Sequence, residues 1–86
     1  MYRITYSKNT IKFFKKHKEA REQFSKISKL FKNNPYTTSL DIRPLSWKHL
    51  WMFRLRVWKY RIIYQIHNSE VEIFLIDAWS RWDMYK

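Results

Sequence analysis

The sequence predicts an α+β domain in which two helices pack on one face of an antiparallel sheet. Apolar residues recur every three or four positions before Pro35 and at every second position after it. The first spacing is that of helices with one buried face, and the second is that of strands with one buried face. The order of these patterns is strand, helix, helix and then several strands, which is an α+β arrangement. We expect residues 1–86 to form one domain.

The N-terminal segment predicts a short strand followed by a helix. Residues 2–6 are mostly aromatic or β-branched, which is typical of a strand. Ser7 is a suitable N-cap for a helix that begins at Lys8. The side chains expected on the buried face of this helix are Ile11, Phe13 and Phe14.

A second helix follows, and we expect it to form an antiparallel hairpin with the first, broken around residues 17–19. Asn33-Asn34-Pro35 ends the second helix, because a residue that precedes proline is disfavoured in the helical conformation. Its expected buried stripe consists of Ala20, Phe24, Ile27, Leu30 and Phe31.

Strands are predicted after Pro35. The expected strands cover residues 40–43, 53–57, 60–66 and 71–76. The last three alternate apolar with other residues and are joined by turns at Trp58-Lys59 and at residues 67–69. This meander predicts a roughly four-stranded antiparallel sheet with the helices packed on one face.

Composition and charge exclude several classes of site. The chain of 86 residues has no glycine and no cysteine, which excludes glycine-loop phosphate motifs, disulfide frameworks, zinc knuckles and thiol nucleophiles. Eighteen Lys and Arg against seven Asp and Glu give a formal net charge of +11, which attracts polyanions and most commonly nucleic acid. An acidic protein or an anionic membrane surface would also fit. No apolar segment is long enough to cross a bilayer and the N-terminus lacks the apolar core of a signal peptide, so we expect a cytoplasmic protein.

Strand alternation predicts three arginines on the face of the sheet that the helices leave open. If the apolar residues of segment 53–57 face the helices, Arg54 and Arg56 emerge on the opposite face, and Arg61 joins them there. Like charges on neighbouring strands repel unless an anion lies among them. Guanidinium groups bind phosphate through two parallel hydrogen bonds, so a phosphodiester is the expected ligand.

The alternative is that the open face of the sheet is simply solvated and binds no phosphodiester, and the spacing of the arginines alone slightly favours this alternative. Its arginines would reach toward Glu70, Glu72 or Asp83.

Few side chains offer conventional acid–base chemistry. His17 falls near a helix end and His67 in a turn, where ordinary surface histidines are common. His49 precedes the arginine-bearing strand and could reach the open face, so it is a candidate proton-transfer group. The acidic residues have no spacing that suggests a metal site, so we expect no metal or cofactor and disfavour a metal-dependent nuclease.

Three motifs lie in the C-terminal half of the chain. They are Arg54-Leu55-Arg56, Tyr60-Arg61-Ile62-Ile63-Tyr64 and Arg81-Trp82-Asp83-Met84-Tyr85. In this order and with these spacings they resemble the RelE/ParE superfamily of bacterial toxins, the toxin halves of type II toxin–antitoxin pairs. The resemblance covers most of the chain and is most specific over residues 45–86.

The resemblance implies an activity, because RelE-like members are endoribonucleases that cut mRNA in the ribosomal A site without a metal. The ribose 2′-hydroxyl attacks the adjacent phosphate, and fixed cations stabilise the charge that develops. By the same resemblance, Arg54, Arg56 and Arg61 would bind the scissile phosphate and stabilise its transition state. Arg81 would neutralise or protonate the leaving oxygen, and Tyr85 would stack on or orient a base.

His49 and Lys59 are further candidates for substrate binding. The sequence departs from the family pattern at the residue expected to act as the general base. RelE-like enzymes often have lysines where this chain has Met52 and Arg54, and arginine is a poor base. Proton transfer would then use His49 or the ribosomal RNA environment, or catalysis would be weak.

The implied partners are an acidic antitoxin encoded nearby, mRNA and the 70S ribosome, with a toxin–antitoxin heterotetramer as one expected assembly. The antitoxin is expected to cover the arginines or to displace the C-terminal segment. Two alternatives stay open: a ParE-like toxin that inhibits DNA gyrase by protein–protein binding, and a basic RNA-binding module without catalysis.

Tryptophan stands at five positions where this superfamily usually has glycine. These positions are Trp47, Trp51, Trp58, Trp79 and Trp82. One hypothesis is that they are UGA codons that the source organism decodes as glycine, and it predicts that several of them lie exposed in turns. The alternative is that the tryptophans are real and stack on RNA bases.

Overall fold

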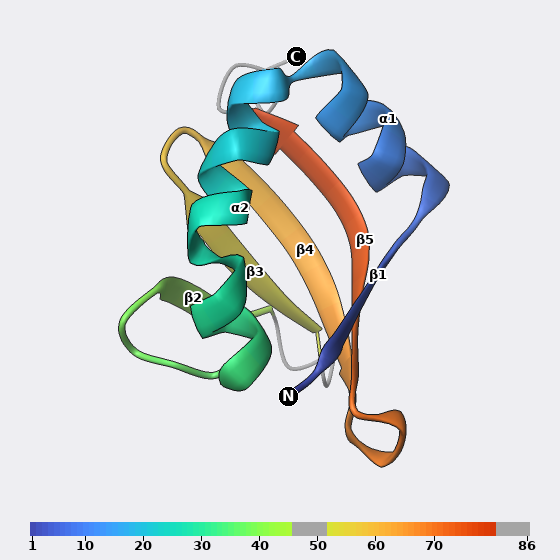
Figure 1. The fold of residues 1–86 in the computed structure, drawn as a ribbon, viewed down its shortest axis with the longest axis vertical. Coiled ribbons are helices and arrows are strands. Elements are labelled where there is room, and N and C mark those ends of the chain that lie inside the picture. Colours follow the sequence, from blue (N-terminus) through green and yellow to red (C-terminus); the bar gives the residue numbers. More distant parts are fainter. Residues whose placement is uncertain (46–51, 81–86) are drawn as a thin grey trace.

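The structure, a computed structural model, describes residues 1–45 and 52–80. Two helices lie on one side of a twisted sheet, as Figure 1 shows. The elements in chain order are β1 (Arg3–Tyr6), α1 (Lys8–Lys16), α2 (Lys18–Asn33), β2 (Asp41–Pro44), β3 (Met52–Val57), β4 (Tyr60–His67), the short 3₁₀ helix η1 (Asn68–Glu70) and β5 (Glu72–Ser80). The α+β class and the order strand, helix, helix, strands are confirmed.

Ser7 caps α1 as predicted and also joins this helix to β5. Its hydroxyl oxygen accepts a hydrogen bond from the Thr10 backbone N–H at 3.1 Å. The same hydroxyl donates to the carbonyl oxygen of Ile76, while the buried Thr10 hydroxyl donates to the carbonyl of Leu75 at 3.1 Å. The cap therefore stabilises the first turn of α1 and fixes its position on the sheet.

The two helices are separated by one residue, His17, whose ψ angle of 81° is not helical. At its other end α2 stops at Asn33, and Asn34 is extended, as expected before Pro35. The carbonyl of buried Pro35 accepts a hydrogen bond at 2.8 Å from the hydroxyl of Tyr64, which joins the end of α2 to the sheet.

Two of the predicted buried positions are wrong. Ile11 is 43% exposed and Leu30 is 42% exposed. In α1, Thr10 occupies the buried position together with Phe13 and Phe14, which have the helical spacing from it, so Ile11 lies beside the buried stripe. Leu30 likewise lies beside Phe31, which is completely buried. The other predicted core side chains of the helices, Phe13, Phe14, Ala20, Phe24 and Phe31, are buried, and Ile27 is partly so.

The sheet has five strands in the order β1-β5-β4-β3-β2, where about four antiparallel strands were expected. The additional strand is β1, which pairs with β5 in parallel, and the other three pairings are antiparallel. Alternation of side chains shows which face of a strand is buried and carries no information about its partner, so the sequence left this pairing open.

The chain reverses twice in the meander, at the turn between β3 and β4 and at η1 between β4 and β5. The β3–β4 hairpin turns at Trp58-Lys59, as predicted, and β5 continues to Ser80, beyond its predicted end at residue 76. A bulge between Ile63 and Tyr64 shifts the β4–β5 register.

The core lies between the helices and the sheet. Tyr64, at its centre, is fully buried and its ring meets that of Phe31 edge-on, with 4.8 Å between centroids. Burial raises the pKa of the Tyr64 hydroxyl well above its usual range, so this group stays neutral.

Candidate functional site

Strand register brings four arginines onto the face of the sheet opposite the helices. Arg56 is the direct partner of Arg61, and Arg43 is the partner of Arg54. Partners in antiparallel strands point to the same face, and Arg54 and Arg56 share it because they are two residues apart. The intervening Leu55 is completely buried on the other face. We call this group the arginine face: Arg43, Arg54, Arg56 and Arg61.

Arg54 is partly enclosed, with 22% of its side chain exposed, whereas 75% of the Arg43 side chain is exposed. One of its terminal nitrogens, Nη2, lies 3.3 Å from Oδ1 of Asp41. Its Nε atom is buried and has no hydrogen-bond partner among the described residues. A buried donor without a partner costs about 1–3 kcal/mol, so an oxygen atom of a bound anion would be stabilising here.

Arg56 and Arg61 differ in their exposure to solvent. Arg56 is exposed, and its Nε–H donates a long hydrogen bond of 3.4 Å to the carbonyl of Trp58. Arg61 is half-buried. Neither forms an ion pair with a residue in the described ranges, although Asp41 of β2 is the direct cross-strand partner of Arg56.

Asp41 is the acid that pairs with this face, in place of the three acids suggested by the sequence. Its Oδ1 atom also lies 3.8 Å from Nε of Arg43. Glu72 instead accepts hydrogen bonds from Thr5 at 2.8 Å and contacts Nδ1 of His67 at 3.0 Å, and Glu70 lies 3.7 Å from the same nitrogen. The expected pairing of the arginines with Glu70 and Glu72 is therefore wrong, and Asp83 lies outside the described residues.

Arg43 and Asp41 were missed by sequence reasoning. The signal was present, because Ile42 packs against the core and the residues on both sides of it must then face outward.

Lys59, a predicted substrate-binding residue, is not brought to the arginine face. Its Nζ atom lies 3.9 Å from Oε2 of Glu19 on α2 and 5.5 Å from the ring centroid of Tyr60, which is buried on the helix side. The other three predicted site residues, His49, Arg81 and Tyr85, lie outside the described residues.

The two remaining histidines are more enclosed than ordinary surface residues. The ring of His17 packs on Phe13 with 4.4 Å between centroids, and it is partly buried. His67 is partly buried as well, and its Nε2 atom lies 2.9 Å from Oε1 of Gln65. His17 lies between the two helices, and His67 is at the far end of β4, six residues from Arg61.

One group of side chains in the described ranges has ligand atoms close enough together to hold a metal ion. It consists of His67, Glu70 and Glu72, whose ligand atoms lie within 4.8 Å of one another. The sequence spacing did not suggest it. Glu72 also lies 3.9 Å from Arg3, so these carboxylates already have protein partners. The group is at the opposite end of β4 from Arg61 and is thus separate from the arginine face.

Two of the five tryptophans fall within the described residues, and they differ. Trp58 lies in a turn, is 56% exposed and has a φ of 59°, in the left-handed region that favours glycine. Trp79 lies in β5 opposite Arg61, and its indole Nε1 is buried with no hydrogen-bond partner in the part of the chain that the structure describes. Trp58 agrees with the expectation of an exposed turn, and Trp79 does not. Trp47, Trp51 and Trp82 lie outside the described residues.

Within the described ranges, neither α1 nor α2 is long and apolar enough to cross a membrane.

Solved structures with the same fold include bacterial and archaeal toxins. A chain of the archaeal RelE–RelB complex from Pyrococcus horikoshii OT3 is 22% identical, with a TM-score of 0.77 over 93% of this chain and 94% of that one. The isolated RelE toxin of E. coli is 19% identical, with a TM-score of 0.73 over 93% and 84%. A YoeB/ParE toxin from Agrobacterium tumefaciens is 15% identical, with a TM-score of 0.71 over 91% and 96%. No family model and no curated protein matches the sequence.

Proposed function

We propose that this chain, which has the RelE-type toxin fold, is the toxin of a type II toxin–antitoxin pair and cleaves mRNA at the ribosomal A site. The observation that carries the proposal is the arginine face, on which Arg56 and Arg61 stand directly opposite each other. Two guanidiniums held together on a sheet surface suit a phosphodiester, which neutralises both charges. The net charge of +11 supports a polyanionic substrate.

The unpartnered Nε–H of Arg54 supports the same substrate. Asp41 holds one terminal nitrogen of this guanidinium, while the Nε edge is left for a ligand. A phosphate oxygen bound there would accept the hydrogen bond that the described residues do not provide. Arg54 would then bind the scissile phosphate together with Arg61.

The proposed reaction is transesterification without a metal. The ribose 2′-oxygen loses its proton and forms a bond to phosphorus, the bond to the 5′-oxygen breaks, and that oxygen gains a proton. The arginines stabilise the additional negative charge on the phosphoryl oxygens of the transition state. The arginine face carries no histidine or lysine from the described ranges, so proton transfer falls to His49, to Arg81 or to the ribosome.

The proposed protein partner is an acidic antitoxin. One solved neighbour is a RelE–RelB complex, and the excess of eleven positive charges on this chain favours a partner of opposite charge. We place the toxin's action in the cytoplasm, where translating ribosomes are found.

Incubation of the purified chain with translating ribosomes tests the proposal. A cut mRNA, mapped by primer extension, is the expected result. Loss of gyrase supercoiling with intact mRNA would support the ParE-like alternative instead. RNA binding without cleavage and without an effect on gyrase would leave only the basic RNA-binding module.

The same assay tests the two site residues outside the described ranges. Substitution of Arg81→Ala together with Tyr85→Ala is expected to abolish cleavage, because the double variant lacks both the group that neutralises the leaving oxygen and the group that orients the base. Unchanged cleavage by this variant would remove both residues from the proposed site.

A further inference from the structure

A small groove lies at the edge of the sheet, beside α2, the beginning of β2 and the end of β3. Its volume of about 350 Å³ is at the lower end of the range of about 300–1,000 Å³ that is usual for small-molecule sites. The side chains that line it are Gln23, Ile27, Leu40, Arg56, Val57 and Trp58. The size of the groove suits a single nucleoside.

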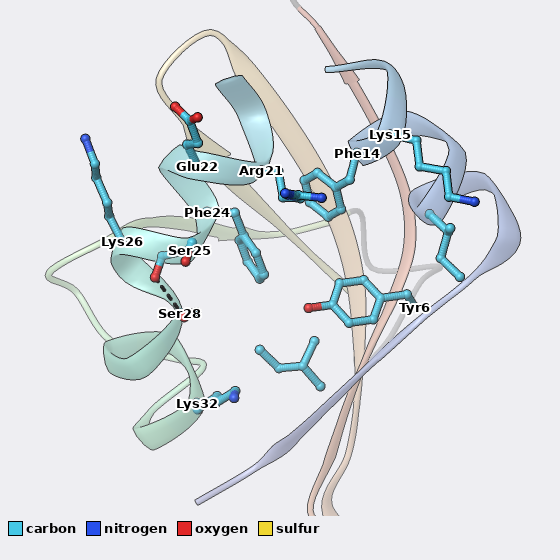
Figure 2. Close-up of a pocket in the computed structure, with 12 residues that line it drawn as sticks. Tyr6, Phe14, Lys15, Arg21, Glu22, Phe24, Ser25, Lys26, Ser28 and Lys32 are labelled. Atoms are coloured by element: carbon cyan, nitrogen blue, oxygen red, sulfur yellow. Dashed lines mark hydrogen bonds between the residues drawn. The ribbon is translucent and has the colours of Figure 1, made fainter. Parts of the chain in front are cut away.

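The helix α2 contributes two side chains to this groove, Gln23 and Ile27. They are four residues apart, so they lie one above the other on the same face of the helix. Figure 2 shows the neighbouring Phe24 pointing from α2 toward Tyr6 of β1, away from this groove. The amide of Gln23 forms no hydrogen bond with another residue in the described ranges, so its carbonyl and its NH₂ group are both available to a ligand.

Three of the lining side chains are apolar. Ile27 and Leu40 pack against the edge of the core, and Val57 is buried. The flat face of a nucleobase is apolar and would cover such side chains, whereas the edge of the base is polar and needs hydrogen-bond partners. The groove therefore offers an apolar contact for the face of a base and an amide for its edge.

Arg56 belongs both to this groove and to the arginine face. It is the cross-strand partner of Arg61, and its side chain also lines the groove. Its Nε–H donates to the carbonyl of Trp58, while its terminal nitrogens form no hydrogen bond or ion pair with a residue in the part of the chain that the structure describes. A phosphate bound by Arg56 and Arg61 would therefore place its nucleoside beside the groove.

We propose that this groove binds the adenine base of an RNA nucleotide whose phosphate is held by Arg56 and Arg61. The carbonyl of Gln23 would accept a hydrogen bond from the 6-amino group of adenine, and its NH₂ group would donate to N7. A glutamine amide pairs with adenine through these two bonds. The choice of RNA as the ligand rests on the proposed function, whereas the groove and its amide do not. The pairing does not use the indole of Trp58, so it is the same whether residue 58 is tryptophan or glycine.

Binding of two trinucleotides to the full chain tests the proposal. The probe is U-A-U with 2′-O-methyl riboses, which lack the 2′-hydroxyl nucleophile and so prevent cleavage. Its control carries purine in place of adenine, which keeps the ring and its stacking but lacks the 6-amino group. We expect the adenine probe to bind at least about fivefold more tightly in an NMR titration, with a shift of the side-chain NH₂ signals of Gln23. Equal affinities would show attraction by charge and stacking alone and would overturn the proposal.

A variant of Gln23 tests the amide. Gln23→Met keeps the length and the helix propensity of the side chain but removes the amide, so it should bind the two probes with affinities within about twofold of each other. A preference for adenine that survives in this variant would contradict the assignment of Gln23.

A second variant tests the phosphate. Arg56→Gln is expected to weaken both probes at least about threefold and to keep the preference for adenine. Its control is Lys29→Gln, which removes one positive charge from an exposed position of α2 outside the groove and should weaken both probes less than about twofold. Equal losses in the two variants would show that Arg56 does not hold the phosphate.

These experiments use no ribosome and no RNA that can be cleaved. A chain that prefers the adenine probe but cuts no mRNA would contradict the proposed endoribonuclease activity and support the groove. A chain that cuts mRNA but binds the two probes equally would do the reverse.

Discussion

Arg56 of β3 and Arg61 of β4 are direct cross-strand partners, and both project from the face of the sheet that lacks the helices. The next pair along the hairpin, Val57 and Tyr60, is buried on the helix side, which fixes the orientation of the arginine pair. Like charges directly opposite each other destabilise a sheet. We therefore expect the pair to weaken the unliganded fold and to become favourable when an anion binds.

This relationship predicts that Arg61→Gln stabilises the unliganded protein while it weakens RNA binding. Removing one of two opposed charges is expected to raise the free energy of unfolding by about 0.5 kcal/mol. For a domain of this size that is a rise in melting temperature of about 2–4 °C at low salt. The gain should shrink in about 1 M salt, where charges are screened.

Thermal denaturation at both salt concentrations checks this prediction, with Arg21→Gln on α2 as the control for loss of one positive charge. A lower melting temperature for Arg61→Gln than for the control would indicate that the arginine pair is not under repulsion.

Asp41→Asn is predicted to strengthen RNA binding. The Asp41 carboxylate lies 3.3 Å from Arg54 and 3.8 Å from Arg43, so it competes with phosphate for both guanidiniums. An exposed ion pair contributes up to about 1 kcal/mol, so an increase in affinity of about twofold to fivefold is expected. Fluorescence anisotropy with a single-stranded RNA oligonucleotide measures it. Glu22→Gln, which removes one negative charge on α2, should have a smaller effect, and an equal effect would indicate net charge alone.

Trp58→Gly is predicted to stabilise the protein. The φ of 59° at this position is strained for a residue with a side chain and is freely adopted by glycine. The gain should be about 1 kcal/mol, and Trp58→Ala should not reproduce it, because alanine retains the strained Cβ. Urea denaturation of the three proteins compares them. Equal stability of the glycine and alanine variants would show that backbone strain at this turn is not important.

The same position bears on the hypothesis of UGA decoding. The gene is expected to carry UGA at codon 58, and protein from the native host should be lighter by the difference between tryptophan and glycine at each recoded position. A UGG codon would rule out recoding there. The codon for Trp79 is a second test of recoding. The indole nitrogen of Trp79 is buried with no hydrogen-bond partner among the described residues, and glycine at this position would remove that nitrogen.

Glu72 is predicted to contribute stability that disappears in acid. Hydrogen bonds from His67 and Thr5 hold the pKa of the Glu72 carboxyl below its ordinary value of 4.5. The contribution is therefore complete above that ordinary value and is lost as the pH falls through the lower value of the folded state. Glu72→Gln should be less stable than wild type near pH 7 and should approach wild type near pH 3. Urea denaturation at several pH values, with the more exposed Glu70→Gln as a control, measures this difference; a gap that does not change with pH would contradict it.

Local features of the fold could be predicted from the sequence because their causes are local. The Ser7 cap, the helix end before Pro35 and the turn at Trp58-Lys59 each depend on a few neighbouring residues. The alternation that buries Leu55 is also local, and it was sufficient to bring Arg54 and Arg56 together.

Features that depend on distant pairing could not be predicted in this way. The parallel pairing of β1 with β5 joins Arg3 to Glu72, and nothing in either segment specifies the other. The salt bridge between Asp41 and Arg54 depends on the β2–β3 register, which the alternation of side chains does not specify. The exposure of Ile11 depends on how α1 and α2 are placed over the sheet, and this is again a tertiary arrangement.

The central claim is that the arginine face is the site of mRNA cleavage, and the most direct test is the cleavage rate of Arg61→Gln on translating ribosomes. Loss of one group that stabilises the transition state costs about 10²–10³ in rate, so this variant should cleave at least about a hundredfold more slowly than wild type. Arg21→Gln on α2 should cleave at the wild-type rate. Cleavage by Arg61→Gln at the rate of the Arg21→Gln control would contradict the claim.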